Sequence, residues 1–197
     1  MASLPTLPQA PVDTTLPTVT GNTYLVNAGD NLQATISAAA AANPSLTHEV
    51  VLQAGASFQG PFTLGARSGS GWVLIRSASS TSLTAGRRVG SSDLANMATI
   101  VGDNTGNSGF AIATSGAADK YRLIGLHITP FATVTSANLV TLNGGSGLIV
   151  DRCWLEGIPD RQTRGVSIQT GNVGIIHSYI SSIIHTDTLG GDTQAIL

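Results

Sequence analysis

Short runs rich in apolar residues, several of them alternating with polar residues, recur along the chain and are separated by Gly, Ser and Asn. Such runs include EVVLQ, WVLIRS, YRLIGLHIT and VGIIHSYIS. A period of two is typical of β-strands, because successive side chains of a strand point to opposite faces. The pattern therefore predicts a chain built mainly from short strands joined by tight turns.

One segment near the N-terminus has a helical pattern instead. The stretch GDNLQATISAAAAANP predicts a helix over 30–43, with Asp30 and Gln33 as a capping box and Asn43-Pro44 as its end. The predicted apolar face consists of Leu32, Ile36 and Ala39 or Ala40.

The strands repeat along the sequence. GLIVDRCWLEG and NVGIIHSYISS superpose with an offset of 25 residues, and YRLIGLHI fits the same template 27 residues upstream. The short strands at 140–142 and 166–168, offset by 26, precede the last two of these units. Strands at this fixed period, with no helix between them, indicate a stacked parallel solenoid. An antiparallel sandwich would not need a fixed period, and a leucine-rich repeat would show another leucine spacing.

We therefore predict an all-β fold, a parallel β-helix in which the helix at 30–43 covers the open end of the first coil. Residues 1–20 are expected to form an extended Pro/Thr-rich lead-in, and residues 21–197 a single domain. The sequence ends in GGDTQAIL, which matches the first strand of another coil, so we expect the chain to be a fragment of a longer solenoid.

Composition excludes several classes of function. Only 10% of residues are charged, the net charge is −2, and Lys120 is the only lysine, which argues against nucleic-acid binding. No apolar run approaches the roughly 20 residues of a membrane span. Cys153 is the only cysteine, so an internal disulfide and a cysteine-based metal site are excluded. The first residues lack the apolar stretch of a signal peptide.

Several segments resemble a known superfamily. The lead-in VDTT, the helix NLQATISAAAA and the segments LQAGASFQGPFTL and SGSGWVLIRS resemble the N-terminal part of right-handed parallel β-helix proteins of the pectate-lyase-like (pectin lyase fold) superfamily. The later segments YRLIGLHIT, DRCWLEG, RGVSIQ and GDTQAI resemble a bacterial branch of these proteins. The likeness covers about residues 12–197. It implies a right-handed coil, a secreted or cell-surface location, and a polysaccharide bound along a groove over the first strand of each coil.

The resemblance also orients the coil. GVSI at 165–168 resembles the groove strand, VGIIH the second strand and SYISS the third. The loops that enter the groove strand would then be Glu156 to Arg164 and Ser182 to Thr193. The chain shows no counterpart of the calcium carboxylates and catalytic arginine motif of pectate lyases. The resemblance therefore predicts the fold but indicates little about the chemistry.

The first of these loops contains the sequence EGIPDRQTRG. Asp160 could act as a base or ligand, and Arg161 and Arg164 could pair with a uronate carboxylate through their bidentate guanidinium groups. The alternative is a solvated loop in which Asp160 pairs with one of the arginines.

The second loop, SIIHTDTLGGDTQ, places His185, Asp187 and Asp192 close together, followed by Gln194 on the groove strand. Asp160 lies on the adjacent coil, so these carboxylates could converge at the strand spacing of about 4.8 Å. The catalytic candidates are Asp160, Arg164, Asp187 and Asp192, and Asp187 and Asp192 are also candidate Ca²⁺ ligands. The substrate-binding candidates are Arg161, His185, Gln194, Ser167 and Gln169. The alternative for this loop is an ordinary Gly-Gly-Asp turn.

Other prominent residues are predicted to be structural. Asp151 and Arg152 are assigned to the corner between the second and third strands, on the side away from the groove. Cys153 is expected to be a small buried residue, and Trp154 and Tyr179 are expected to stack on each other between coils.

The sequence thus predicts a β-helix that binds and could cleave an acidic polysaccharide. Lyase chemistry is favoured over hydrolysis because arginines accompany the carboxylates. The alternative is a non-catalytic adhesion or structural solenoid that recognises a surface glycan or a protein.

Overall fold

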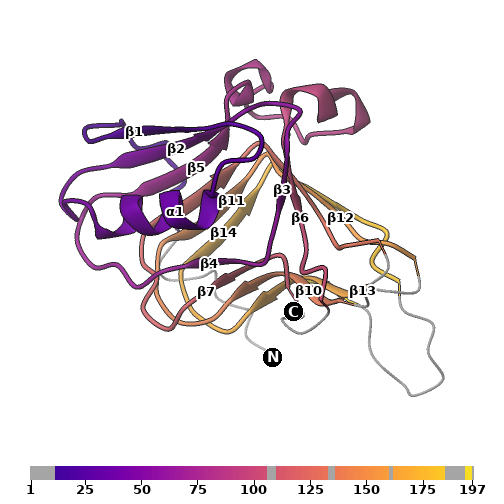
Figure 1. Cartoon of the computed structure of the whole chain (residues 1–197). Helices are drawn as coiled ribbons and strands as arrows, with labels where there is room; N and C mark the ends of the chain where they lie inside the picture. Colours follow the sequence, from indigo (N-terminus) through magenta and orange to yellow (C-terminus); the bar gives the residue numbers. More distant parts are fainter. Residues whose placement is uncertain (1–11, 106–109, 133–135, 160–161, 185–193, 197) are drawn as a thin grey trace, which may run out of the picture.

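Three parallel sheets wind around one interior in the computed structural model, which describes residues 12–105, 110–132, 136–159, 162–184 and 194–196 (Figure 1). Sheet A has six strands, in the order β1 (Thr23–Val26), β2 (His48–Leu52), β5 (Val73–Ser77), β8 (Tyr121–Ile124), β11 (Leu148–Asp151) and β14 (Val173–Ile176). Sheet B has five strands, in the order β15 (Tyr179–Ser181), β12 (Trp154–Glu156), β9 (Leu126–Thr129), β6 (Ala98–Val101) and β3 (Ser57–Gln59). Sheet C also has five, in the order β16 (Gln194–Ile196), β13 (Gln162–Ile168), β10 (Ser136–Leu142), β7 (Ile112–Thr114) and β4 (Phe62–Leu64).

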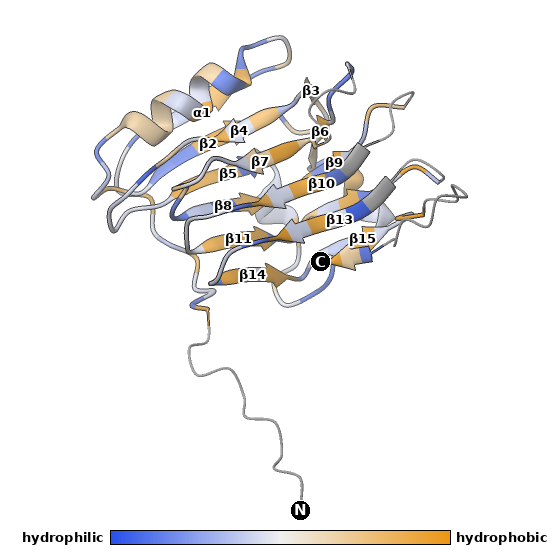
Figure 2. Ribbon diagram, turned by 90° about the horizontal axis from the view of Figure 1, so that it is seen from below, coloured by the Kyte–Doolittle hydropathy of each residue, from blue (hydrophilic) through white to orange (hydrophobic). Residues whose placement is uncertain are grey.

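From β2 onward the chain visits sheets A, B and C in turn, and each strand pairs in parallel with its counterpart one coil away. The predicted parallel β-helix is therefore confirmed. The predicted offsets are also correct, since Leu148 pairs with Val173 and Val140 with Val166. Figure 2 shows the coils stacked from α1 at one end to β14 at the other.

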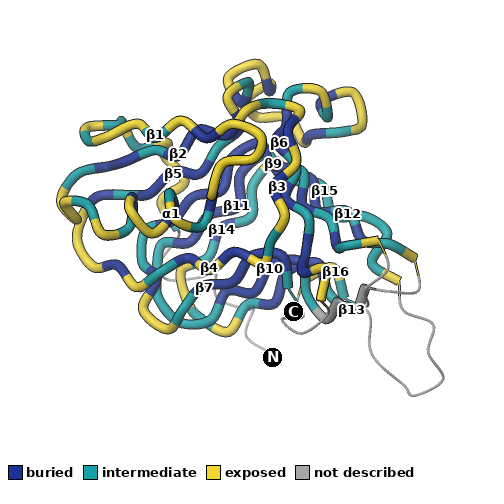
Figure 3. Tube along the Cα trace, viewed as in Figure 1, coloured by how far each residue is buried: buried dark blue, intermediate teal, exposed yellow. Residues whose placement is uncertain are grey.

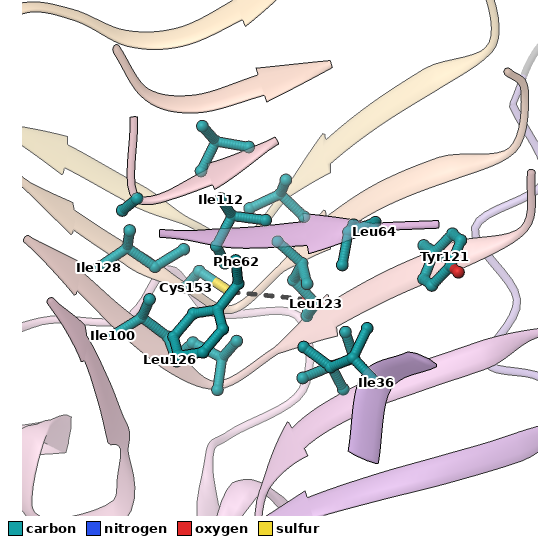
Figure 4. Packing of buried hydrophobic residues seen from close by; sticks show 14 of the residues in the cluster. Ile36, Phe62, Leu64, Ile100, Ile112, Tyr121, Leu123, Leu126, Ile128 and Cys153 are labelled. Atoms are coloured by element: carbon teal, nitrogen blue, oxygen red, sulfur yellow. Dashed lines mark hydrogen bonds between the residues drawn. The ribbon is translucent and has the colours of Figure 1, made fainter. Parts of the chain in front are cut away.

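Apolar side chains that point inward from the strands fill the interior. Buried residues run along all three sheets (Figure 3). Figure 4 shows part of this packing, in which side chains from α1 and from all three sheets meet in the interior, among them Ile36, Tyr121, Ile128 and Phe62. Among the largest side chains that are less than 2% exposed are Leu52, Leu64, Ile75, Ile100, Leu123, Leu126, Ile128, Leu139 and Leu142.

The first coil is covered by α1 (Leu32–Ala41), whose buried residues are Leu32, Ile36 and Ala39, as predicted. The predicted capping box is wrong. Asn31 is the N-cap, and its Oδ1 accepts a hydrogen bond from the backbone N–H of Ala34. Gln33 is unavailable for a capping box because its amide pairs with the backbone N–H and C=O of Thr63 in β4. The side chain thereby joins the helix to sheet C.

The C-terminal end of α1 is closed by Arg67, which is 5% exposed. Its Nη1 donates to the carbonyl oxygens of Ala39 and Ala40, and its Nη2 to those of Pro44 and Leu46. The last carbonyls of a helix have no partner within the helix and carry partial negative charge, so a guanidinium group at this end stabilises it.

The corner between sheets A and B has the same backbone conformation in three successive coils. Gly125, Arg152 and His177 occupy it with φ values of 62°, 49° and 52°. These are left-handed conformations, which turn the chain within one residue. Each corner therefore joins a strand of sheet A to the next strand of sheet B through a very short connection.

The N-terminal segment at 12–22, here called the strap, crosses the outer face of sheet A. At one end, Val12 lies near Gly174 of β14, and at the other the backbone N–H groups of Thr20 and Gly21 donate to the carbonyl oxygen of Thr47. Between these points, Nη1 of Arg122 donates to the carbonyl oxygens of Thr14 and Thr15. The strap thus spans most of the coils.

An insertion at 79–97 follows β5 and contains two short 3-10 helices, η1 (Ser80–Ser82) and η2 (Ser91–Asn96). Its buried residues Leu83, Val89 and Met97 form a second small core with Trp154 of sheet B. No helix in the described part of the chain is long and apolar enough to cross a membrane.

Candidate functional site

Strand β13 begins earlier than the sequence indicated. Arg164 was expected in the loop that enters the groove strand, but it lies inside β13 (Gln162–Ile168). The strand is extended because β10 pairs with it from Ser136 onward, with Asn138 opposite Arg164. The position of Arg164 is therefore fixed by its neighbours in the sheet rather than by a loop.

The side chain of Arg164 is on the outer face of sheet C. A Cβ placed on the next residue, Gly165, would lie 2.6 Å from Cγ2 of Ile180, so position 165 points into the interior. Leu139, which follows Asn138 in β10, is likewise completely buried. Val140 and Val166 are completely buried as well, so the alternation of faces is interrupted just before them. We place Asn138 and Arg164 on the outer face because their immediate neighbours, Leu139 and Gly165, point inward.

Three successive strands carry a row of polar side chains on this face. Asn138, Arg164 and Gln194 are register partners in β10, β13 and β16, and we call them the polar row. Adjacent members are one strand spacing apart, about 4.8 Å. All three are partly buried, and Asn138 and Arg164 take part in polar interactions. Within the described residues, the buried Oε1 of Gln194 accepts no hydrogen bond.

A second row of hydroxyl groups lies beside the polar row. Thr141 and Ser167 are register partners and are only 7% and 1% exposed. Of the residues predicted to bind substrate, Gln169 is exposed, Gln194 lies on β16 as expected, and Ser167 is almost completely buried. The substrate-binding role of these residues stays a prediction.

The remaining candidates lie outside the described residues: Asp160, Arg161, His185, Asp187 and Asp192. Their predicted convergence with Arg164, and the prediction that Asp187 and Asp192 bind Ca²⁺, therefore stay predictions. Within the described ranges there is no group of three or more His, Cys, Asp or Glu side chains that could hold a metal ion.

A buried ion-pair cluster on sheet A was missed by the sequence reasoning. Asp151 was assigned to a corner, but it is the last residue of β11 and is 1% exposed. Arg122, which is 3% exposed, donates to it from Nη2 at 2.8 Å, and Arg152 donates from Nε at 2.9 Å. Burial acts to raise the pKa of Asp151, but the hydrogen bonds and charges of Arg152 and Arg122 outweigh it and hold that pKa below its ordinary value.

The signal that could have revealed this cluster is Arg122 itself. It stands in the otherwise apolar strand YRLI, and it is separated from Thr14 by 108 residues. A charge inside an apolar strand needs a partner when the strand is covered. Nothing in the strap sequence identifies which strand it crosses.

The predicted contact between Trp154 and Tyr179 on sheet B is present, with the two rings tilted by 47° rather than stacked face to face. The rings of Trp154 and Tyr179 lie 5.6 Å apart, and Trp154 is only 8% exposed because the 79–97 insertion covers it. Nearby, Nε2 of His127 lies 2.9 Å from Oε2 of Glu156. Cys153 is buried as predicted, and burial raises the pKa of its thiol to about 12. These residues hold adjacent coils together.

Comparison with known proteins supports the fold. No family model matches the chain, and no curated protein matches it. Among solved structures, the chain is similar to the alginate lyase from Paenibacillus sp. str. FPU-7, with a TM-score of 0.55 and 22% sequence identity. The likeness covers 79% of this chain and 43% of the alginate lyase, so the chain spans less than half the length of that protein. At this identity the likeness shows a shared fold.

Proposed function

We propose that the protein binds an acidic polysaccharide along the outer face of sheet C. The polar row carries this proposal, because it places a guanidinium group between two amides on three successive coils. The fold shared with an alginate lyase supports a polysaccharide as the class of ligand. A linear polymer presents the same groups repeatedly along its length, and the polar row repeats along the axis of the solenoid.

The charge of this face favours an anionic polymer. The described strands of sheet C contain no Asp or Glu, and Arg164 is their only charged residue. A guanidinium group can bind a carboxylate through two parallel hydrogen bonds. The amides of Asn138 and Gln194 can donate to and accept from sugar hydroxyl groups on either side.

Cleavage by elimination would use the same position of Arg164. A base removes the proton alpha to the uronate carboxylate, the electron pair forms the new carbon–carbon double bond, and the glycosidic oxygen leaves with a proton from an acid. Arg164 would stabilise the negative charge that develops on the carboxylate. The base would come from the predicted loop residues Asp160, Asp187 or Asp192.

Binding is tested by titrating the protein with alginate, polygalacturonate and the neutral polymer dextran. Arg164→Gln should weaken binding of the acidic polymers by about tenfold or more, because one charge-assisted hydrogen bond contributes about 1.5–3 kcal/mol. Arg88→Gln is the matched control, since Arg88 is an exposed arginine on the 79–97 insertion. Equal affinity for dextran, or equal losses in the two variants, would contradict the proposal.

Elimination is tested separately, by the ultraviolet absorbance of the unsaturated uronate that it produces. Absorbance that grows with time and is lost in Arg164→Gln supports a lyase. A second candidate function is a non-catalytic β-helix that recognises a glycan. It predicts binding of acidic polymer without any growth in absorbance.

A further inference from the structure

We propose a second sugar-binding site at the corner between sheets C and A, where Trp72, Lys120 and the strap line an open pocket of about 270 Å³. The ligand is one uronate unit of an acidic polysaccharide. This choice of ligand rests on the proposed function, whereas the location rests on the residues of the corner alone.

The site is built from one position that recurs in four coils. Trp72, Lys120, Gly147 and Asn172 immediately precede β5, β8, β11 and β14, whose first residues are aligned in register. Backbone hydrogen bonds join the column, since the N–H of Val73 donates to the carbonyl oxygen of Lys120. The side chains are therefore held on a rigid frame at intervals of about 4.8 Å.

Lys120 lies across this column. Its φ of 60° directs the chain through a left-handed corner, and its Nζ lies 5.3 Å from the ring centroid of Trp72. Gly147 leaves the space that the lysine stem occupies, because a Cβ there would lie 3.1 Å from Cδ of Lys120. An aromatic ring and a cation thus share one wall of the pocket, and both are partly exposed.

The strap contributes Asp13 to the lining of the pocket. Its Oδ1 accepts a hydrogen bond from the backbone N–H of Thr15 at 2.9 Å, which fixes the carboxylate. This bond and the hydroxyl group of Thr15 lower the pKa of Asp13, so the group is ionised at neutral pH and accepts hydrogen bonds. Ser146 and Asn172 add a hydroxyl group and an exposed amide.

These groups match the surfaces of a uronate. The apolar C–H face of a pyranose packs on an aromatic ring, while its hydroxyl groups donate to a carboxylate and bond to amides. The uronate carboxylate is the group that Lys120 would bind, and a neutral sugar lacks it. Lys120 is the only lysine in the chain, so its contribution can be removed without changing any other ammonium side chain.

The test uses the intrinsic fluorescence of tryptophan. The chain contains two tryptophans, and Trp154 is 8% exposed, so Trp72 is the one that a ligand at the corner can reach. Titration of the whole chain with a trimer of galacturonate should change the emission saturably. Trp72→Phe, which leaves only Trp154, should show no change.

Substitution of Lys120 tests the chemistry of recognition. Lys120→Gln should weaken the binding that Trp72 reports by about tenfold, the equivalent of about 1.4 kcal/mol. Lys120→Arg, which keeps the charge, should retain most of the affinity. Thermal unfolding of each variant controls for loss of the fold.

Three results would overturn this site: emission that does not respond to the trimer, an equal response to the neutral trimer maltotriose, or unchanged affinity in Lys120→Gln. The Arg164→Gln variant separates it from the proposed function. It should leave the Trp72 response intact while weakening binding of the polymer. If acidic polymers bind through Arg164 but Trp72 is silent, only the corner site fails.

Discussion

Arg122 and Asp151 lie on neighbouring strands of sheet A and form an ion pair in which both side chains are at most 3% exposed. The same arginine binds two carbonyl oxygens of the strap, while Asp151 also receives Arg152. One carboxylate thus orders a contact between segments more than one hundred residues apart in the sequence.

Asp151→Asn should destabilise the protein strongly. Removing one partner of a buried ion pair leaves the other charge uncompensated, which costs about 3–5 kcal/mol in free energy of unfolding. Unfolding in urea measures the loss. Glu156→Gln is the matched control, because Glu156 is 38% exposed and its removal should cost no more than about 1 kcal/mol. Equal losses in both variants would contradict a special role for Asp151.

Stability should also fall in acid for the same reason. The folded-state pKa of Asp151 is lowered, so its contribution to stability is complete above the unfolded pKa of about 3.9 and is lost as the pH falls through the folded pKa. The wild type should therefore lose more stability than Asp151→Asn below about pH 4. Urea unfolding at a series of pH values measures both slopes, and parallel curves would refute the assignment. Glu49 keeps its own contribution in both proteins.

Gly145 and Gly86 form a matched pair of positions that tests how closely neighbouring coils approach each other at a corner. Both have left-handed backbones, with φ of 78° and 74°. A Cβ at Gly145 would overlap the carbonyl oxygen of Ala118 on the neighbouring coil, whereas a Cβ at Gly86 would meet nothing within 4 Å. Gly86→Ala should cost about 1–2 kcal/mol from backbone strain alone. Gly145→Ala should cost about 1–3 kcal/mol more, from overpacking.

That difference is measured by thermal or urea unfolding of the two alanine variants. If Gly145→Ala were no less stable than Gly86→Ala, the close approach of the two coils at this corner would be wrong.

Arg67 should be required for the helix that covers the first coil. Arg67→Met removes the donors to Ala39, Ala40, Pro44 and Leu46, and should destabilise the protein by about 1.5–3 kcal/mol, the typical contribution of hydrogen bonds to a charged group. Arg67→Lys should lose less, because it keeps the charge. Hydrogen exchange of the α1 amides shows whether the loss is local to the helix, and unchanged protection in Arg67→Met would contradict the proposed role.

The sequence alone was sufficient to predict the stacked coils, because their strands recur at a fixed period. Leu148 and Val173 could be aligned by counting 25 residues, and no tertiary information was needed. The limits of strands were harder, because β13 is extended to include Arg164 by its pairing with β10 and β16. The N-cap of α1 was misplaced by one residue, at Asp30 rather than Asn31, and Gln33 bonds to Thr63 thirty residues away rather than closing a capping box.

Contacts without a period could not be predicted. Arg122 gave a local sign that a partner was needed, but the choice of Thr14 and Thr15 depends on the path of the strap. The corner pocket was missed for the same reason, since Asp13 belongs to the strap and Trp72 and Lys120 to different coils. Of the candidate site residues, the sequence named Arg164 and Gln194, and their alignment in one row follows from the register; their role in binding stays a prediction.

The left-handed corners at Gly125, Arg152 and His177 have a consequence for how such a chain can change in length. One residue added at any of them would shift the following strand of sheet B by one position and turn its apolar side chains toward solvent. A longer connection at this edge should therefore need a fold of its own. The 79–97 insertion, which joins β5 of sheet A to β6 of sheet B, is such a case, because it has its own small core. The segments that join sheet B to sheet C are not bound by a one-residue turn, so new binding loops can arise there without disturbing the stack.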